Sequence, residues 1–68
     1  MGKIIKKITF YKLTEKMPED GDVVLIGNPG NYIECTIYKN GRFYDYQEMY
    51  YYWLPDDVEY WAYAKWED

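Results

Sequence analysis

The fold is decided by residues 32–45, YIECTIYKNGRFYD, in which two runs of strand-forming residues flank Asn40-Gly41. A two-residue Asn-Gly loop favours a type I′ turn, because both central residues adopt positive φ and the twist of this turn matches that of the strands it joins. The stretch therefore predicts a β-hairpin with strands at 32–39 and 42–46.

The turn also fixes the register of the hairpin, because it places Lys39 opposite Arg42. Side chains alternate between the two faces of a strand, so each further pair changes face. Both faces carry large side chains, and we expect both to be covered. The expected pairs are Ile37 with Tyr44 and Cys35 with Tyr46 on one face, and Tyr38 with Phe43 and Thr36 with Asp45 on the other.

A third strand is expected before the hairpin. Residues 22–27, DVVLIG, form a short, nearly continuous apolar run. Such a run is typical of a strand with both faces covered, so we expect it centrally in the sheet. Residues 28–31, NPGN, place Pro and Gly at the two central positions of a type II turn. Three successive strands joined by tight turns predict an antiparallel meander.

The two ends of the chain also favour strands. Residues 3–13 contain the β-formers Ile4, Ile8, Phe10 and Tyr11 without a sustained helical stripe. Near the other end, VEYWAYAKW at 58–66 alternates in the manner of a strand.

Residues 46–54 are ambiguous. Asp45 and Glu48 have the spacing of a helix cap, whereas the Met-Tyr-Tyr-Tyr-Trp run at 49–53 is β-prone. We expect an irregular segment or a short helical turn here, ended before Pro55.

These elements predict a mainly β fold, with α+β as the alternative. We expect a single domain over residues 1–68, built on one small antiparallel sheet of four or five strands. The expected strands are at about 3–13, 22–27, 32–39, 42–46 and 58–66.

Aromatic residues are more abundant than a core of this size can use. The 68-residue chain contains ten Tyr, three Trp and two Phe. A chain this short buries only about 60% of the surface that its unfolded form exposes, and one ring can bury about 150–250 Å². Several rings must therefore lie on the surface, where Tyr and Trp commonly anchor protein interfaces.

The net charge of −4 is unevenly distributed. Residues 1–16 contain five Lys and one Glu, a sum of +4, whereas residues 45–68 contain seven carboxylates and one Lys, a sum of −6. This asymmetry favours a basic partner for the C-terminal part. An ordinary solvated surface, with the two ends close together in the fold, explains it equally well.

The location expected from the sequence is the cytoplasm. A single cysteine cannot form an internal disulfide, whereas a secreted domain of this size normally has several cysteines. The first 13 residues contain no apolar run longer than Ile4-Ile5, so neither a signal peptide nor a membrane span is predicted.

Enzyme chemistry is not predicted. With no His and one Cys, few metal ligands exist, and we expect no metal, no cofactor and no catalytic residue. Cys35 has no His to activate it and is predicted to be a small buried hydrophobe. The adjacent Asp56 and Asp57 are predicted to form a solvated turn. Lysines and rings lie in different halves of the chain, so direct nucleic-acid binding is not expected.

Several short motifs resemble a family of small phage and prophage proteins, the DUF551 group. EKMPEDG at 15–21 followed by VVL is similar to the family's Leu-Pro-x-x-Gly/Asp turn, GRFYD at 41–45 to its Gly-x-aromatic hairpin, and VEYW at 58–61 to its Val-x-His-Trp stretch. Met17 replaces the usual Leu, Tyr60 replaces the usual His, and the family's early Trp and Pro-rich ending are missing. The resemblance covers about residues 13–62 and implies a small β-rich domain in a phage or prophage setting, with no activity to carry over.

The sequence favours a non-enzymatic module that inhibits a host protein by occupying its surface, with an antiviral defence protein or a nucleic-acid-binding protein as the partner. One alternative is an oligomeric sponge for a nucleotide-like signal molecule, and another is a structural or assembly subunit that forms homo-oligomers. The expected partner-binding side chains are Tyr50, Tyr51, Trp53, Asp56, Asp57 and Glu59.

Overall fold

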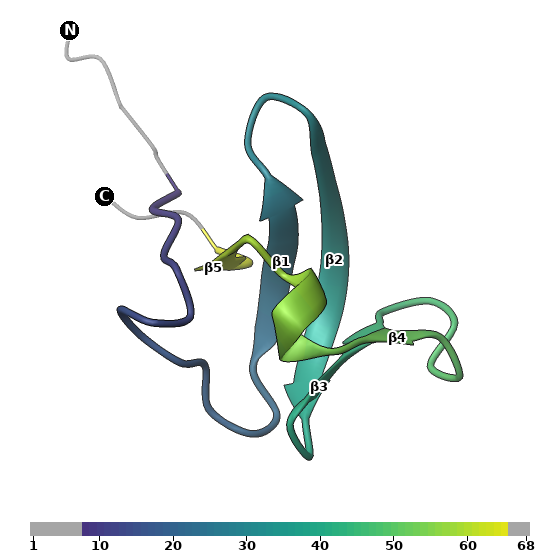
Figure 1. The fold of residues 1–68 in the computed structure, drawn as a ribbon. Coiled ribbons are helices and arrows are strands. Elements are labelled where there is room, and N and C mark those ends of the chain that lie inside the picture. Colours follow the sequence, from purple (N-terminus) through teal and green to yellow (C-terminus); the bar gives the residue numbers. More distant parts are fainter. Residues whose placement is uncertain (1–7, 66–68) are drawn as a thin grey trace, which may run out of the picture.

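The computed structural model describes residues 8–65 and shows one antiparallel sheet of five strands in the order β4-β3-β2-β1-β5 (Figure 1). Strands β1 to β4 form a meander, and β5 returns to the free side of β1. The predicted mainly β fold with a single antiparallel sheet is confirmed. The elements are β1 Val23–Asn28, β2 Tyr32–Lys39, β3 Arg42–Asp45, β4 Tyr52–Trp53, the 3-10 helix η1 Pro55–Asp57, and β5 Tyr60–Tyr63.

The β2–β3 hairpin has the predicted turn and register. Asn40 and Gly41 both adopt positive φ, 52° and 74°, as a type I′ turn requires. The four pairs from Lys39↔Arg42 to Thr36↔Asp45 are those expected. Beyond the ladder, the backbone N–H of Tyr46 donates to the carbonyl of Cys35 at 3.0 Å.

The turn that leads into this hairpin is also confirmed. The N–H of Asn31 donates to the carbonyl of Asn28 at 2.9 Å, and Gly30 adopts φ 87°, which is the geometry of a type II turn. The strand before it, predicted at 22–27, is β1, and it lies inside the sheet between β2 and β5.

The prediction of a strand at 3–13 is wrong for residues 8–13, which form no strand. Residues 3–7 lie outside the part of the chain that the structure describes. Residues 8–13 contribute one isolated bridge, Tyr11↔Trp61. The chain then turns away, because the N–H of Glu15 donates to the carbonyl of Lys12 at 2.9 Å and the Glu15 carboxylate accepts the N–H of Lys12. This local turn replaces the ladder that a full strand would have formed.

Strand β4, which was not among the predicted strands, comes from the ambiguous segment 46–54. After an irregular loop, β4 pairs Tyr52 with Tyr44 and Trp53 with Phe43. Pairing with β3 therefore outweighs the helical alternative. Within residues 8–65, helix appears only as η1, which has Pro55 at its start. At the C-terminal end, β5 covers only the middle of the predicted 58–66, and residue 66 lies outside the described part.

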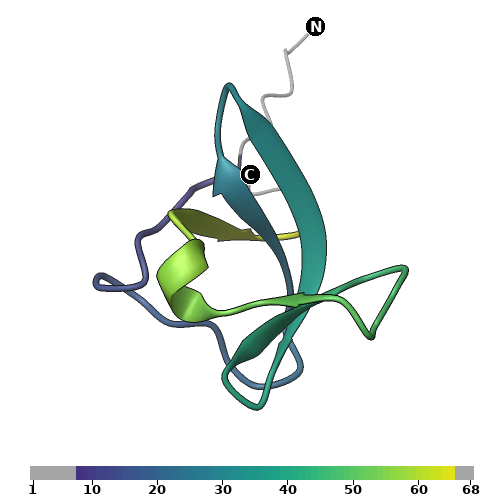
Figure 2. The same ribbon diagram turned by 45° about the vertical axis from the view of Figure 1, so that its right-hand side comes forward.

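The sheet curls around one small core. β4 and β5 occupy opposite edges of the sheet yet are joined by only six residues, and the ribbon shows the strands wrapping toward each other with η1 between them (Figure 2). The concave side encloses the buried side chains Val24, Ile26, Phe43, Val58 and Trp61. Buried Thr36 donates its hydroxyl to the carbonyl of Val24 at 3.0 Å, so its polar group is satisfied.

The expectation that both faces of the hairpin are covered is wrong. The face with Thr36, Tyr38 and Phe43 packs into or against the core, whereas Ile37 and Tyr44 on the other face are only half-buried. Cys35, expected to be buried, is exposed. One layer of side chains is all that a chain this short can place over such a sheet.

Candidate protein-binding surface

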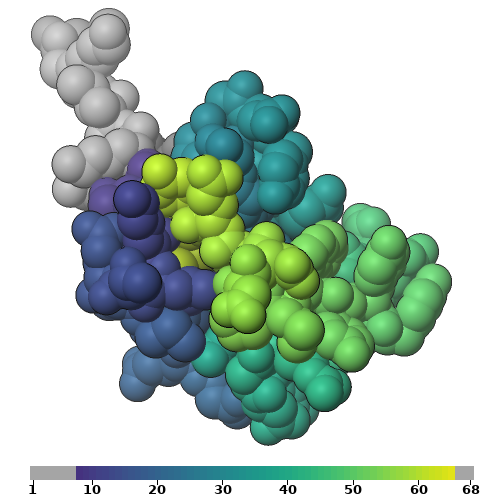
Figure 3. All heavy atoms as spheres, in the orientation of Figure 1, coloured from purple at the N-terminus to yellow at the C-terminus, as the bar shows by residue number. Residues whose placement is uncertain are grey.

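An aromatic hairpin projects from the body of the molecule. We call residues 44–54, which comprise the end of β3, the following loop, β4 and Leu54, the aromatic arm. In the ribbon and space-filling views its loop extends away from the core (Figures 1 and 3). Its large exposed side chains, with their exposed fractions, are Tyr46 54%, Met49 44%, Tyr50 81%, Tyr51 59%, Tyr52 41% and Leu54 47%.

The loop of the arm is held by its own polar groups. The Asp45 carboxylate accepts the backbone N–H groups of Gln47 at 3.1 Å and Glu48 at 2.8 Å. The N–H of Tyr51 donates to the carbonyl of Glu48 at 2.9 Å, and the N–H of Asp45 donates to the carbonyl of Tyr51 at 2.8 Å. Because the backbone is fixed in this way, the exposed rings start from an ordered arrangement, which lowers the entropic cost of binding.

Ring contacts order the side chains of β4. Tyr51 and Trp53 stack with centroids 5.7 Å apart and planes 5° apart. Tyr52 lies 5.6 Å from Tyr44, and the Arg42 guanidinium stands 4.6 Å from the Tyr52 ring centroid, a cation–π distance. A hydrogen bond with the Tyr44 side chain, together with the charges of both tyrosines, raises the pKa of Arg42. Arg42 is thus a fixed positive charge at the base of an otherwise acidic arm.

The six residues expected to bind a partner separate into two groups. Tyr50 and Tyr51 lie exposed in the loop of the arm, and Trp53 is half-buried with its ring packed against the core. Asp56 and Asp57 are exposed on η1. The carboxylate of Glu59 accepts a hydrogen bond from the Asn28 side chain at 3.1 Å and so ties the start of β5 to the β1–β2 turn.

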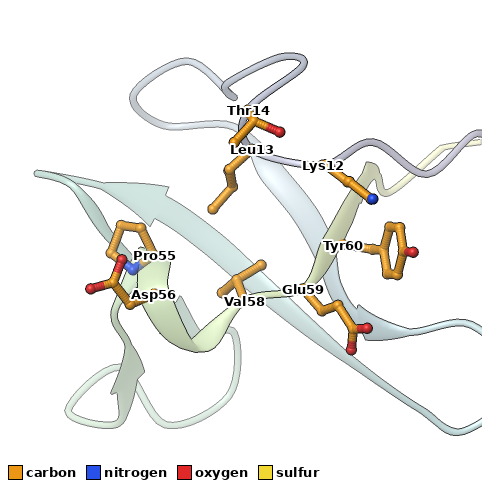
Figure 4. Close-up of a pocket in the computed structure, with 8 residues that line it drawn as sticks. All are labelled: Lys12, Leu13, Thr14, Pro55, Asp56, Val58, Glu59 and Tyr60. Atoms are coloured by element: carbon orange, nitrogen blue, oxygen red, sulfur yellow. The ribbon is translucent and has the colours of Figure 1, made fainter.

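Asp56 and Glu59 of the second group border a shallow cleft of about 370 Å³ (Figure 4). One wall is the turn at 12–14, and the other is the segment from η1 to the start of β5. Leu13 and Val58 point toward each other across it. The cleft combines Lys12, whose ammonium stands 5.9 Å from the Tyr60 ring centroid, with the carboxylates of Asp56 and Glu59.

The sequence missed four of the exposed side chains of the arm, namely Tyr46, Met49, Tyr52 and Leu54. The signal that would have found Met49, Tyr52 and Leu54 is the uninterrupted run at 49–54, MYYYWL, in which a strand cannot bury both of its faces in so small a protein. The loop at 46–51 is the irregular segment that was expected there, with a short helical turn as the alternative, because Asp45 and Glu48 also fit a helix start.

Comparison of the chain with family models, with characterised proteins and with solved structures gives no match. Within residues 8–65, no group of three His, Cys, Asp or Glu side chains is placed to hold a metal ion. No helix in the same part of the chain has the length and apolarity needed to cross a membrane.

Proposed function

We propose that this protein is a non-enzymatic binding module whose aromatic arm occupies the surface of another protein and thereby inhibits it. The observation that carries the proposal is the exposure of the rings and Met side chain at 49–52, four consecutive large residues on a hairpin that projects from the core. Exposed contiguous apolar surface in a small soluble domain marks an interaction site.

The composition of the arm suits the centre of a protein interface. Tyr, Trp and Met are enriched in interfaces, and Tyr in particular gives a wide contact area at low rotamer cost. The buried rings of the core are Phe43 and Trp61 from β3 and β5, and Trp53 is the ring of the arm that packs against them. The exposed rings Tyr50 and Tyr51 are therefore not part of the core.

Charge indicates the chemistry of the partner. Residues 44–59 contain five carboxylates and no Lys or Arg, so the arm and the following η1 form a continuous acidic segment. A basic protein surface, such as one that holds nucleic acid, is complementary to it. The phage or prophage setting implied by the resemblance to the DUF551 group makes a bacterial host protein, including one of antiviral defence, the partner class, encountered in the host cytoplasm.

The experiment is affinity capture from bacterial lysate with quantitative mass spectrometry. The full chain, the double variant Tyr50→Ser/Tyr51→Ser and the matched control Tyr32→Ser are used as baits. Tyr32 is 47% exposed at the start of β2, away from the arm. We expect a protein with a basic surface to be captured by the wild type and the control and lost from the double variant.

The circular dichroism spectra and melting curves of the three baits check that the fold is intact. Equal capture by all three baits would show that the arm is not the binding surface. Loss of capture by Tyr32→Ser alone would move the site to the β1–β2 end of the sheet.

A nucleotide-like ligand, the alternative expected from the sequence, has less support. Three clefts in the described part of the chain hold at least as many carboxylates as cations: Asp56 and Glu59 with Lys12, Glu19 and Asp22 with Lys65, and Glu34 with Asp45. Phosphate groups are stabilised by paired cationic donors, and these clefts repel them instead. A thermal-shift screen against nucleotides checks this directly, since a specific ligand raises the melting temperature by mass action.

A further inference from the structure

The edge of β2 is open along the first half of this strand. β2 spans Tyr32–Lys39, but its ladder with β3 covers only 36–39. One further backbone bond follows, from the N–H of Tyr46 to the carbonyl of Cys35 at 3.0 Å. Beyond this point β2 has β1 on one side and no strand of residues 8–65 on the other, and the loop of the aromatic arm projects from that open side (Figures 1 and 2).

The backbone of Ile33 faces this open edge. In an antiparallel sheet, successive residues of a strand direct their N–H and carbonyl groups to opposite sides. The carbonyl of Cys35 points away from β1, because it accepts from Tyr46, so Ile33, two residues earlier, presents its N–H and carbonyl to the same side. No backbone group within residues 8–65 pairs with them there. Open strand edges of this kind can take up an extended segment of another chain.

A hollow of about 260 Å³ adjoins this edge where β3 ends and the arm begins. Glu34 lines it and pairs with Ile26, which places Glu34 on the core side of the sheet. Asp45 pairs with Thr36 and lies on the same side, whereas Cys35, next to Glu34 in β2, points to the outer side. Because its lining comes from both sides of the sheet, the hollow opens at the sheet edge. We call this hollow and the open edge at 33–35 the edge notch.

The edge notch carries negative charge that no cation balances. The residues that line the hollow include the carboxylates of Glu34 and Asp45 and no Lys or Arg. The N–H groups of Gln47 and Glu48 both donate to Oδ2 of Asp45, so its Oδ1 stays available to another donor. A Lys or Arg side chain is therefore stabilised in the hollow. A second copy of the chain paired at the same edge would bring like charges together, which disfavours self-association here.

We propose that the edge notch is a strand-addition site for an extended, basic segment of another protein. The segment pairs with the backbone of Ile33 and places a Lys or Arg side chain in the hollow, between Glu34 and Asp45. This goes beyond the proposed function, because it assigns a second contact site and its binding mode. It does not depend on the rings of the arm, since Tyr50 lies outside the notch. A partner that engages both sites gains avidity over the arm alone.

The test is an NMR titration of the full chain with a short synthetic strand-forming peptide, acetyl-Thr-Val-Arg-Val-Thr-amide. Only a few hydrogen bonds hold such a peptide, so we expect a Kd on the order of 1 mM. The largest amide shift changes are expected at residues 33–35 and 45–47. At a peptide concentration of about ten times the Kd, hydrogen exchange at the amide of Ile33 should slow by about tenfold, because the bound state protects it.

A matched peptide and two variants of the protein test the role of charge. The same peptide with Glu in place of Arg should leave these amides unshifted. Glu34→Gln should weaken binding of the Arg peptide by about tenfold, because the charged partner of a hydrogen bond is lost. Glu19→Gln removes an exposed carboxylate in the turn before β1, at the far end of β2, and should leave binding unchanged. The two peptides are compared on the wild-type chain, so the comparison holds even if Glu34→Gln does not fold.

Four results would overturn the proposal. Unshifted amides at 33–35 with about 10 mM Arg peptide mean that the edge takes up no strand. Equal shifts with the Arg and Glu peptides mean that the carboxylates do not select the segment. Shifts without slower exchange at Ile33 mean that the contact is made by side chains alone. Shifts at 33–35 that follow protein concentration without any peptide mean that a second copy occupies the edge.

Discussion

At the scale of single residues, the backbone around Gly27 depends on the absence of a side chain. Gly27 lies in β1 with φ 138°, and a Cβ there would overlap the carbonyl oxygen of Tyr32 on the neighbouring strand. Gly30 also has positive φ, 87°, but a Cβ would meet nothing within 4 Å. Gly27 is therefore required because a side chain would clash, whereas Gly30 is favoured only by its backbone conformation.

We expect Gly27→Ala to lower the free energy of unfolding by more than about 2 kcal/mol, because backbone overlap adds to the cost of positive φ. Gly30→Ala should cost about 1 kcal/mol from the φ preference alone. Urea denaturation of both variants measures the difference. Equal losses would mean that β1 and β2 move apart at Gly27 without penalty.

The ionisation of Cys35 makes the free energy of unfolding depend on pH. Partial burial, followed by the nearby Asp45 carboxylate, raises the pKa of the Cys35 thiol above its ordinary value. As the pH rises through the ordinary cysteine pKa, about 8.5, the unfolded chain loses its proton first, so this group contributes a loss of stability on the alkaline side.

In dilute protein we expect the alkylation rate of Cys35 by iodoacetamide to rise with a midpoint above that ordinary pKa. Asp45→Asn should shift the midpoint down, because it removes the charge but keeps an oxygen that can still accept from the loop. A midpoint at or below the ordinary value in the wild type would contradict the assigned environment.

At the scale of elements, the aromatic arm has its shape because Asp45 ends β3 and caps the loop that follows. The chemistry resembles a helix cap, in which one carboxylate satisfies two backbone N–H groups of the next turn. Here the chain returns to pair with β3 instead of continuing as a helix.

We expect Asp45→Ala to cost about 1 kcal/mol of stability and to speed hydrogen exchange at the amides of Gln47 and Glu48. Asp45→Asn keeps an acceptor and should have a smaller effect on both. Exchange rates by NMR in the two variants measure the contribution of the cap. Unchanged exchange in Asp45→Ala would show that backbone hydrogen bonds alone hold the loop.

At the same scale, some elements were predictable from sequence and others were not. The β2–β3 hairpin and the turn at 28–31 follow from local chemistry, since Asn40-Gly41 and Pro29-Gly30 each favour one turn geometry. β4 does not follow from local chemistry, because its existence depends on pairing with Tyr44 and Phe43. The acidic residues of the predicted site were also separated from its rings by tertiary packing. Asp56 on η1 and Glu59 after it lie in one cleft with the turn at 12–14.

At the scale of the whole molecule, Trp61 connects parts of the chain that are distant in sequence. It is fully buried, its indole N–H donates to the carbonyl of Lys16 at 2.8 Å, and its ring lies 5.3 Å from Tyr11 and 5.0 Å from Tyr63. The Trp61 side chain therefore adds to the backbone bridge with Tyr11 in attaching the segment before β1 to the sheet.

Trp61→Phe leaves a cavity and removes the donor to Lys16, so we expect it to lower the free energy of unfolding by about 2–3 kcal/mol. A domain of this length has only several kcal/mol in total, and the variant should melt much lower. Urea titration measures the loss, and Trp53→Phe, a half-buried tryptophan at the sheet edge, is the comparison with the smaller expected effect. Equal losses at both tryptophans would show that Trp61 has no special role.

The proposed function requires that the exposed rings of the aromatic arm bind another protein. This is tested by the affinity of the captured partner for three proteins, the wild type, Tyr50→Ser/Tyr51→Ser and Tyr32→Ser, measured by isothermal titration calorimetry. Ring anchors at the centre of an interface each contribute about 2 kcal/mol or more, so loss of both should weaken binding by about 700-fold, with Tyr32→Ser close to the wild type. Affinities that are the same for all three proteins would show that the arm is not the binding surface.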